Sequence, residues 1–243
     1  MTEDHSSCIR VSDAKMCNFC HSKNIIKNGT TKTKKQQYFC KNCNRRFIEF
    51  YSYKAYHSNI NSDIIKFTKE GLGIRSIARI LNISTTTLFK RILSIAKTII
   101  PPKIIYGQSY ELDEMRIFIR KKSNPQWLVY AIHKNTKSII GFNIGKRTNK
   151  TLNTVIKTLI HSEPEKIYTD RLRNYRYLIP KEIHSTKRFG TNSIERMNLN
   201  IRTNLKRLNR RTICFSKSNI ILHSILKIYF GVAAFFNNSC IKN

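Results

Sequence analysis

Two hydrophobic periods alternate along this chain of 243 residues. Over Asn59–Ala96 apolar residues recur every three to four positions, which is the period of amphipathic helices. Over Tyr110–Gly145 the period changes to two, which is the period of strands. The helical period returns at Thr148–Ile160, and Lys166–Tyr168 is a short apolar strand. This order predicts a helical region followed by an α/β domain.

The α/β region begins with three strands separated by polar turns, which predicts an antiparallel meander. The strands are Tyr110–Arg120, Gln126–His133 and Ser138–Gly145. In the first strand, Asp113 lies on the apolar face with Met115, whereas Glu114 lies on the other face. A carboxylate on an apolar face must be compensated, and a bound cation is one way to do so. Asp170 follows the short strand, where an α/β sheet usually presents its chemistry. Taken singly, each of these acids is as easily explained as a surface residue or a cap.

The stretch Asn192–Arg211 is predicted to be one long helix. Its apolar stripe is Ile194, Met197, Ile201, Leu205 and Leu208. Around that stripe the residues are basic, and Glu195 is the only carboxylate between Lys187 and Arg211. Arg202 follows Glu195 by seven positions and falls on nearly the same side of the helix. Glu195 is either part of an ordinary salt bridge within the helix or a metal-binding carboxylate among phosphate-binding cations. A further apolar segment, Ile220–Phe236, is interrupted by His223 and Lys227, which favours a helix packed on the protein over a membrane span.

The helical region has the spacing of a helix-turn-helix. Ile74–Leu81 is followed by a turn at Asn82-Ile83, and Ser84 is a suitable N-cap for a helix over Thr85–Ala96. In a DNA-reading unit the exposed residues of the second helix enter the major groove. Those residues are Ser84, Thr85, Thr86, Lys90 and Arg91. Any three-helix unit can imitate this pattern. Pro101-Pro102 ends the region and marks a linker.

The charge of the chain changes the interpretation of these elements. Forty-five basic against fourteen acidic residues leave a net charge of +31, so the expected partner is a polyanion. No segment resembles a signal peptide or an uninterrupted spanning helix, so nucleic acid is favoured over membrane and a cytoplasmic location is expected. Cysteines of such a protein are expected to be reduced.

Two cysteine pairs predict a metal site. Cys17 and Cys20 are separated by nineteen residues from Cys40 and Cys43, which is the spacing of a four-thiolate zinc site on two tight turns joined by two short strands. The alternative is four free or disulfide-bonded cysteines. Four thiolates complete a tetrahedral set, so the single Zn2+ is predicted to be structural.

The acids of the α/β region form the second candidate site. Only eight acids follow the linker, and Asp113, Asp170 and Glu195 occupy positions that a sheet would bring together. Three carboxylates can hold two divalent cations that promote phosphoryl transfer, and Mg2+ or Mn2+ suits such oxygen ligands.

Several motifs together resemble the transposase of the insertion sequence 1 family. They are the two Cys pairs, Leu112-Asp113-Glu114, Trp127 with Tyr130-Ala131-Ile132, Tyr168-Thr169-Asp170, Ile194-Glu195-Arg196, Asn198-Leu199-Asn200-Ile201-Arg202 and Arg211-Thr212-Ile213-Cys214-Phe215-Ser216. The resemblance implies an RNase H-like catalytic domain with a mixed sheet and an Asp, Asp, Glu triad. The triad maps to Asp113, Asp170 and Glu195, and the basic residue that follows the Glu by seven positions maps to Arg202.

The residue patterns and the resemblance together predict a domain order and a function. We expect a lead-in at 1–16, a zinc ribbon at 17–50, a helix-turn-helix at 57–98, a linker at 99–109 and the catalytic domain at 110–243. Basic residues of the last third are expected to hold DNA: Arg196, Lys206, Arg207, Arg210 and Arg211. The implied function is a bacterial DNA transposase that binds terminal inverted repeats, cuts and joins strands of double-stranded element and target DNA with two Mg2+ ions, and acts as a homo-oligomer. The alternatives are a sequence-specific DNA-binding regulator and a structure-selective nuclease of the same fold.

Overall fold

The chain folds into two compact units, Met1–Tyr56 and His57–Asn243. The computed structural model describes residues 15–32, 34–48, 55, 59–100, 102 and 105–231. Most of the predicted lead-in and all residues after Gly231 lie outside the described residues, as do parts of the predicted linker. Among the described helices, none has the length and apolar composition needed to cross a membrane.

The first unit is a three-stranded antiparallel sheet. Its strands are β1 (Ile25–Thr30), β2 (Gln36–Cys40) and β3 (Arg46–Ile48), paired in that order. The sequence predicts two short strands separated by Asn28-Gly29 and by the polar run Thr31–Gln37. The break between β1 and β2 falls within that polar run, whereas Asn28 and Gly29 lie inside β1. Gly29 has a φ of +68°, and the pairing with β2 shifts between Lys27 and Thr30. The glycine therefore marks a bulge in the strand, a use that resembles a turn in the sequence.

Three helices open the second unit. They are α1 (Ile60–Lys69), α2 (Ile74–Ile80) and α3 (Thr85–Thr98). The predicted cap of α3 is confirmed, since the Ser84 side chain accepts a hydrogen bond from the Thr87 amide at 3.0 Å. The turn before it contains Asn82 at a φ of 52°, the left-handed conformation that Asn tolerates. Leu88 and Ile92 are fully buried, and α2, a short turn and α3 follow one another at the predicted positions.

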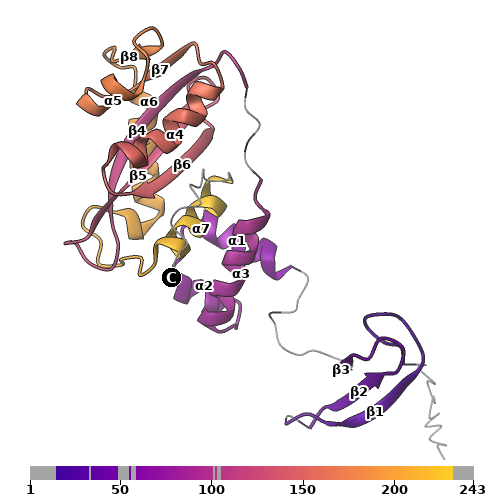
Figure 1. Cartoon of the computed structure of the whole chain (residues 1–243). Helices are drawn as coiled ribbons and strands as arrows, with labels where there is room; N and C mark the ends of the chain where they lie inside the picture. Colours follow the sequence, from indigo (N-terminus) through magenta and orange to yellow (C-terminus); the bar gives the residue numbers. More distant parts are fainter. Residues whose placement is uncertain are drawn as a thin grey trace, which may run out of the picture. The chain divides into compact units, whose positions relative to one another are not determined.

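A mixed five-stranded sheet forms the centre of the second unit (Figure 1). Its strands are β4 (Ser109–Phe118), β5 (Pro125–His133), β6 (Ile139–Gly145), β7 (Lys166–Tyr168) and β8 (His184–Ser185). The order is β6-β5-β4-β7-β8. Strands β4, β5 and β6 pair antiparallel. Strand β7 runs parallel to β4, and β8 runs parallel to β7. This order and these directions are those of an RNase H-like fold. The sequence did not predict β8, because a strand of two residues has no periodicity.

Helices cover both faces of this sheet (Figure 1). On one face, α4 (Asn149–His161) and α5 (Arg173–Leu178) pack over alternate residues of β4 and β5 such as Leu112 and Val129. On the other face, α6 (Asn192–Asn204) and α7 (Asn219–Phe230) pack over Met115 and Tyr130. Helices α1 and α3 also contact α7. The alternation along β4 thus directs Asp113 towards α6.

Helix α6 ends earlier than predicted. The helix was expected to continue to Arg211, but it stops at Asn204 and is followed by a 3-10 turn, η2 (Lys206–Leu208). Leu205 and Leu208 are nonetheless buried, because residues three positions apart lie on one side of a 3-10 turn as well as of an α-helix. Thr203 and Asn204 are weak helix formers, and the Asn204 side-chain amide donates to the Tyr229 hydroxyl of α7 at 2.9 Å.

Helix α7 packs on the protein as predicted, with Leu222 and Leu226 fully buried. It was expected to continue to Phe236, but it ends at Phe230 because Gly231 caps it with a φ of 68°. This left-handed cap is typical of glycine. Residues 232–236 of the predicted helix lie outside the described residues.

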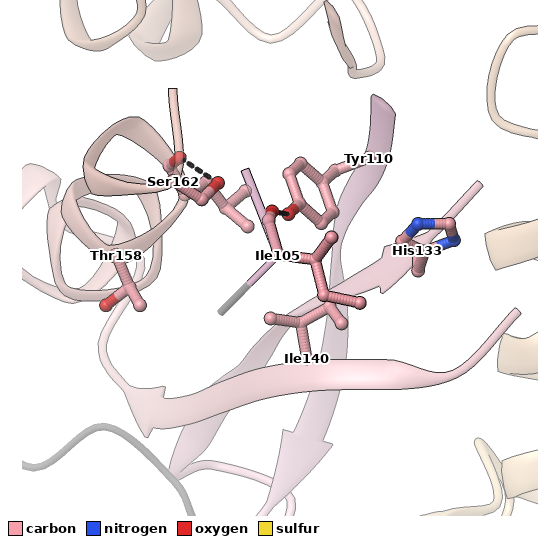
Figure 2. A pocket seen from close by; sticks show the side chains of 7 residues that line it. Ile105, Tyr110, His133, Ile140, Thr158 and Ser162 are labelled. Atoms are coloured by element: carbon pink, nitrogen blue, oxygen red, sulfur yellow. Dashed lines mark hydrogen bonds between the residues drawn. The ribbon is translucent and has the colours of Figure 1, made fainter. Parts of the chain in front are cut away.

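A small cavity lies beneath α4 (Figure 2). Its volume is about 10 Å³, which is room for about one water molecule. The polar groups around it have partners, since the Tyr110 hydroxyl donates to the Ile105 carbonyl at 3.0 Å and the Ser162 hydroxyl donates to the Leu159 carbonyl at 2.6 Å. The cavity is therefore a packing feature of the core.

Candidate functional site

Asp113 lies on β4 beneath α6. Its Oδ1 accepts a hydrogen bond from the Glu114 amide at 2.7 Å, and its Oδ2 accepts one from Asn198 Nδ2 of α6 at 2.6 Å. The Tyr130 hydroxyl lies 3.0 Å from Asn198 Oδ1 and holds this amide in place. Asp113 therefore sits on the apolar side of the sheet, as its position in the strand predicts.

The parallel pairing of β4 and β7 brings a second acid to Asp113. Glu111 of β4 is opposite Tyr168 of β7, so the residues two positions further along, Asp113 and Asp170, are neighbours. Carboxylate oxygens of Asp113, Glu114 and Asp170 all lie within 4.8 Å of one another. Three like charges this close repel one another in the absence of a cation. Carboxylate oxygens are also the ligands that hard divalent metals prefer, so the cluster has the donor set of such a metal.

Glu114 is the member of the cluster that sequence reasoning placed elsewhere. Its side chain is 2% exposed and forms an ion pair with Arg147, which follows β6. Its other oxygen accepts a hydrogen bond from the Tyr175 hydroxyl of α5. Both oxygens of Glu114 are thus engaged by the protein. Strand alternation gave the correct face for Glu114 but not its distance from Asp170, which depends on where β7 ends.

Glu195 is outside this cluster, although it lies on the same groove. It is an exposed residue in the first turn of α6, and its Oε1 accepts a hydrogen bond from the Thr191 hydroxyl at 3.0 Å. The structure therefore brings Asp113 and Asp170 together and places Glu195 on α6, where it lines the same groove as Asp113.

The start of α6 is fixed by a buried acid that sequence reasoning missed. Glu111 is 1% exposed, and its Oε2 accepts a hydrogen bond from the Ile194 amide at 2.9 Å. Its Oε1 lies 3.7 Å from Lys134 Nζ and 3.8 Å from Lys137 Nζ. A carboxylate at a helix N-terminus satisfies a free backbone amide and complements the helix dipole. Glu111 lies two residues before Asp113 on the same face, so it sets α6 in register with the acidic cluster.

A groove of about 730 Å³ adjoins the acids. It is lined by Asp113, Glu114 and Glu195 together with Arg202, Arg210 and Arg211. Had α6 continued as a straight helix, Arg211 would lie about 24 Å from Glu195 along its axis. The break after Asn204 instead returns the chain to the groove.

Arg202 is the arginine best suited to bind an anion. Among the described residues, its buried Nε has no hydrogen-bond partner. Burial, followed by the charge of Arg210, lowers the pKa of Arg202 below its usual value. A guanidinium whose buried Nε lacks a partner, close enough to a second arginine to feel its charge, is stabilised by a bound anion.

The other predicted DNA-binding residues take different positions. Arg196 and Lys206 are exposed and do not line the groove, and Arg207 Nη1 points to the Ser216 hydroxyl at 3.4 Å. On the helix-turn-helix, Thr85, Thr86 and Lys90 are exposed and Arg91 is half-buried, while the Ser84 side chain is engaged in capping α3.

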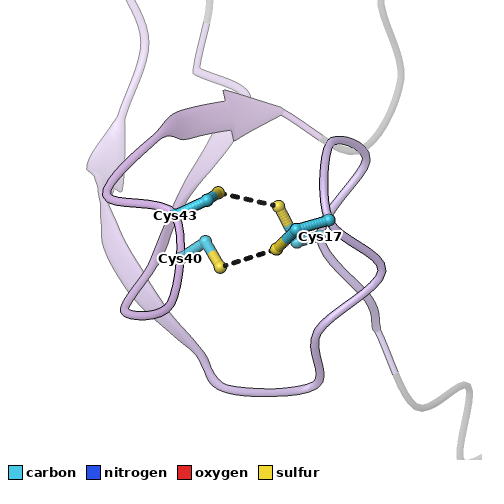
Figure 3. Close-up of side chains that lie close together, drawn as sticks. Cys17, Cys40 and Cys43 are labelled. Atoms are coloured by element: carbon cyan, nitrogen blue, oxygen red, sulfur yellow. Dashed lines mark hydrogen bonds between the residues drawn. The ribbon is translucent and has the colours of Figure 1, made fainter.

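The four predicted zinc ligands meet in the first unit (Figure 3). The sulfur atoms of Cys17 and Cys43 lie 3.6 Å apart, and those of Cys20 and Cys40 lie 3.5 Å apart. A disulfide requires about 2.05 Å, whereas sulfurs bound tetrahedrally at 2.3 Å from zinc lie about 3.8 Å apart. Backbone amides, first that of Cys43, lower the pKa of the Cys40 thiol to about 6, whereas burial and the hydrogen bond with Cys40 raise the pKa of the Cys20 thiol to about 12. The described geometry fits a closed four-thiolate site.

The charge of Asp113 is expected to destabilise the fold when no cation is bound. Burial first, and then the charges of Glu114 and Asp170, raise the pKa of Asp113 from 3.8 to about 6. Because the folded state holds this proton more tightly than the unfolded chain, the cost is absent below pH 3.8, grows towards pH 6 and is complete above it. We expect Asp113→Asn to increase stability at pH 8 by about 1–3 kcal/mol, since the amide removes the charge but keeps only one acceptor oxygen.

Thermal melts of both proteins in buffer without magnesium or manganese measure this effect. The difference in melting temperature between parent and variant should be largest at pH 8 and smaller at pH 4.5, where Asp113 is mostly protonated in the folded state. A change in packing alone would not depend on pH. Added Mg2+ should raise the melting temperature of the parent more than that of the variant. Equal stability at pH 8 would contradict a buried, repelled charge at Asp113.

Comparison with known proteins gives consistent matches. The family profile described as IS1 transposase matches residues 108–236. InsB of insertion element iso-IS1n from Shigella dysenteriae is 33% identical over 126 residues, which are 52% of this chain and 96% of that protein. InsB of IS1 from Shigella flexneri is 30% identical over 122 residues, which are 50% of this chain and 93% of that protein. Among solved structures, the HTLV-2 integrase catalytic core in complex with magnesium has 15% identity and a TM-score of 0.34, covering 52% of this chain and 87% of that chain. The matched residues 108–236 include the acidic cluster, Glu195 and the arginines of the groove.

Proposed function

The chain belongs to the IS1 transposase family, and on that premise we propose that it binds the terminal inverted repeats of its own insertion sequence, cuts the DNA at their ends and joins those ends to target DNA. The observation that carries this proposal is the acidic cluster of Asp113, Glu114 and Asp170 beside a groove lined by three arginines. Acids and arginines in one groove suit a reaction at a phosphodiester, because the acids hold cations and the arginines hold phosphates.

Asp113, Asp170 and Glu195 are the proposed metal ligands. Two Mg2+ or Mn2+ ions bound there would activate the attacking water or hydroxyl and stabilise the leaving oxygen. Glu114 is a weaker candidate, because Arg147 and Tyr175 already occupy its two oxygens. Its proposed role is structural, because its contacts with Arg147 and Tyr175 fix β4 beside Asp113. Glu195 lines the same groove from α6, where its only described partner is the Thr191 hydroxyl, so its carboxylate is free to turn towards a cation.

The arginines of the groove are proposed to bind the DNA backbone. Arg202 offers a buried Nε without a partner among the described residues, which matches a phosphate oxygen. Arg210 and Arg211 extend the cationic lining along the groove. We place Arg196, Lys206 and Arg207 in a wider basic surface that attracts DNA without positioning the scissile phosphate.

Recognition of the repeats is assigned to the zinc ribbon and the helix-turn-helix. The proposed base-reading helix is α3, with Thr85, Thr86 and Lys90 exposed near its N-terminal half. Ser84 and Arg91 stay in the proposed interface beside them. Transposition joins two ends, so at least two copies of the chain are proposed to act together on the DNA. The proposed location is the bacterial cytoplasm, where that DNA lies.

A cleavage and joining assay tests the proposal. Duplex oligonucleotides carrying the imperfect inverted repeats that flank the gene should be nicked at the repeat ends in Mg2+, and precut ends should join to a second duplex. The controls are a duplex with a scrambled repeat and a branched junction. Cutting of the junction whatever its sequence would favour the structure-selective nuclease, and repeat binding with no cutting or joining would favour the regulator.

A further inference from the structure

Phe189 has an unusual backbone conformation in the turn between β8 and α6. Its φ is 63°, a left-handed value that is costly for a bulky aromatic residue. Its side chain is 68% exposed, so burial of the ring does not compensate the strain. A strained and exposed aromatic residue indicates a contact that the isolated chain does not make.

Contacts of Gly190 with Tyr168 and Lys134 hold the backbone of this turn in place, and Phe189 remains exposed. At the next position, a Cβ added to Gly190 would lie 2.7 Å from Tyr168 Cδ1 and 2.9 Å from the Lys187 carbonyl oxygen. Lys134 Nζ donates to the Gly190 carbonyl at 3.0 Å and lies 3.6 Å from the centre of the Tyr168 ring. The backbone behind Phe189 is thus packed against β7 and has little room to rearrange.

The charge of this turn favours a nucleic acid as the partner. The Arg188 guanidinium lies 4.9 Å from the centre of the Phe189 ring. Lys187 precedes it, and no acid occurs between Lys187 and Glu195. An aromatic ring beside cations matches a base beside its phosphate, whereas an apolar protein partner would leave these cations without counterions.

The turn also lies between the segments that carry the acids. Tyr168, on which Gly190 packs, precedes Asp170 by two residues. After the turn, α6 starts at Asn192 and carries Glu195 in its first turn. Thr191, two residues after Phe189, donates a hydrogen bond to Glu195, so the turn is tied to the segments of both Asp170 and Glu195.

We propose that Phe189 stacks on an unpaired DNA base next to the phosphate being cut, and so holds the end of the element open. The inference rests on the proposed function for its DNA substrate. Stacking of one base on an aromatic side chain changes affinity on the order of tenfold to a hundredfold, and the pre-formed turn means that the protein does not reorganise to make the contact.

Binding without chemistry tests this role. Fluorescence anisotropy in the absence of Mg2+ compares a fully paired repeat end with one that carries two mismatched pairs at the cleavage position. We expect the parent to prefer the mismatched end by about tenfold and Phe189→Leu to lose that preference, since Leu keeps apolar volume without an aromatic face. Tyr177→Ala is the matched control, because Tyr177 is an aromatic residue that is 84% exposed on α5 and has no positive φ.

A second variant tests whether a loss of preference could come from misfolding. Phe189→Gly removes the ring at a φ that glycine adopts freely, so it should melt at or above the temperature of the parent while also losing the preference. An unchanged preference in Phe189→Leu and Phe189→Gly, or an equal loss in Tyr177→Ala, would overturn the proposal. Failure of the proposed function would give a different result. The parent would still prefer the mismatched end in the binding assay but would cut no DNA in Mg2+.

Discussion

Replacement of Asp113, Asp170 or Glu195 by the corresponding amide is expected to lower cleavage and strand transfer by orders of magnitude while binding of the repeat ends survives. Each change keeps the size of the side chain and removes one negative charge from the proposed metal site. The same site serves both steps, so both should fall together. Pairs of replacements should be little worse than single ones, because residues that act as a unit are not additive.

Glu114→Gln is the control that separates the two possible ligand sets. If Glu195 completes the metal site, Glu195→Gln is inactive and Glu114→Gln keeps measurable activity, because Glu114 is held by Arg147 and Tyr175. The reverse result would replace Glu195 by Glu114 in the ligand set. The measurement is the cleavage and joining assay with uncut and precut ends, run beside a binding assay on the same variants. Strand transfer by all three amide variants at the parental rate would refute the site.

The positions of Asp113 and Asp170 were predictable because each depends on a local pattern. Strand alternation places Asp113 on the face of Met115, and an acid just past a short apolar strand marks the end of β7. Neither pattern contains the register between β4 and β7, which sets Glu111 opposite Tyr168. That pairing joins residues more than fifty positions apart, and it alone brings Glu114 within reach of Asp170.

The residues that position the acidic cluster are harder to predict from the sequence, because no local pattern identifies them. Glu111 is one of three carboxylates in β4, and no local pattern distinguishes it from the other two. Its role depends on the Ile194 amide of α6, which donates a hydrogen bond to it. Arg147 lies in a loop and Tyr175 in a helix of six residues, too short for a hydrophobic period to identify. The end of α6 was predicted wrongly because its apolar pattern is clear but fits two structures. The Leu205 and Leu208 spacing fits an α-helix and a 3-10 turn equally well, so periodicity could not choose between them.

Loss of the zinc site is expected to have the second large effect, and to act on recognition instead of chemistry. Cys40 is fully buried in the first unit, whose remaining described core is small and centres on Tyr38 and Phe47. A unit of this size depends on its metal for folding. Cys40→Ser should therefore unfold the ribbon and abolish preferential binding to the repeat ends, while the second unit, compact in its own right, keeps its fold.

Metal analysis and two binding measurements check this expectation. Purified parent protein should contain about one zinc per chain, and Cys40→Ser should contain much less. Cys214→Ser is the matched control, because Cys214 is an exposed cysteine of the second unit and should keep both zinc and repeat binding. Binding to random duplex should fall less than binding to the repeats in Cys40→Ser, since the net charge of +31 is almost unchanged and supplies affinity that is independent of sequence. Full discrimination between repeat and random DNA after complete removal of zinc would show that the ribbon takes no part in recognition.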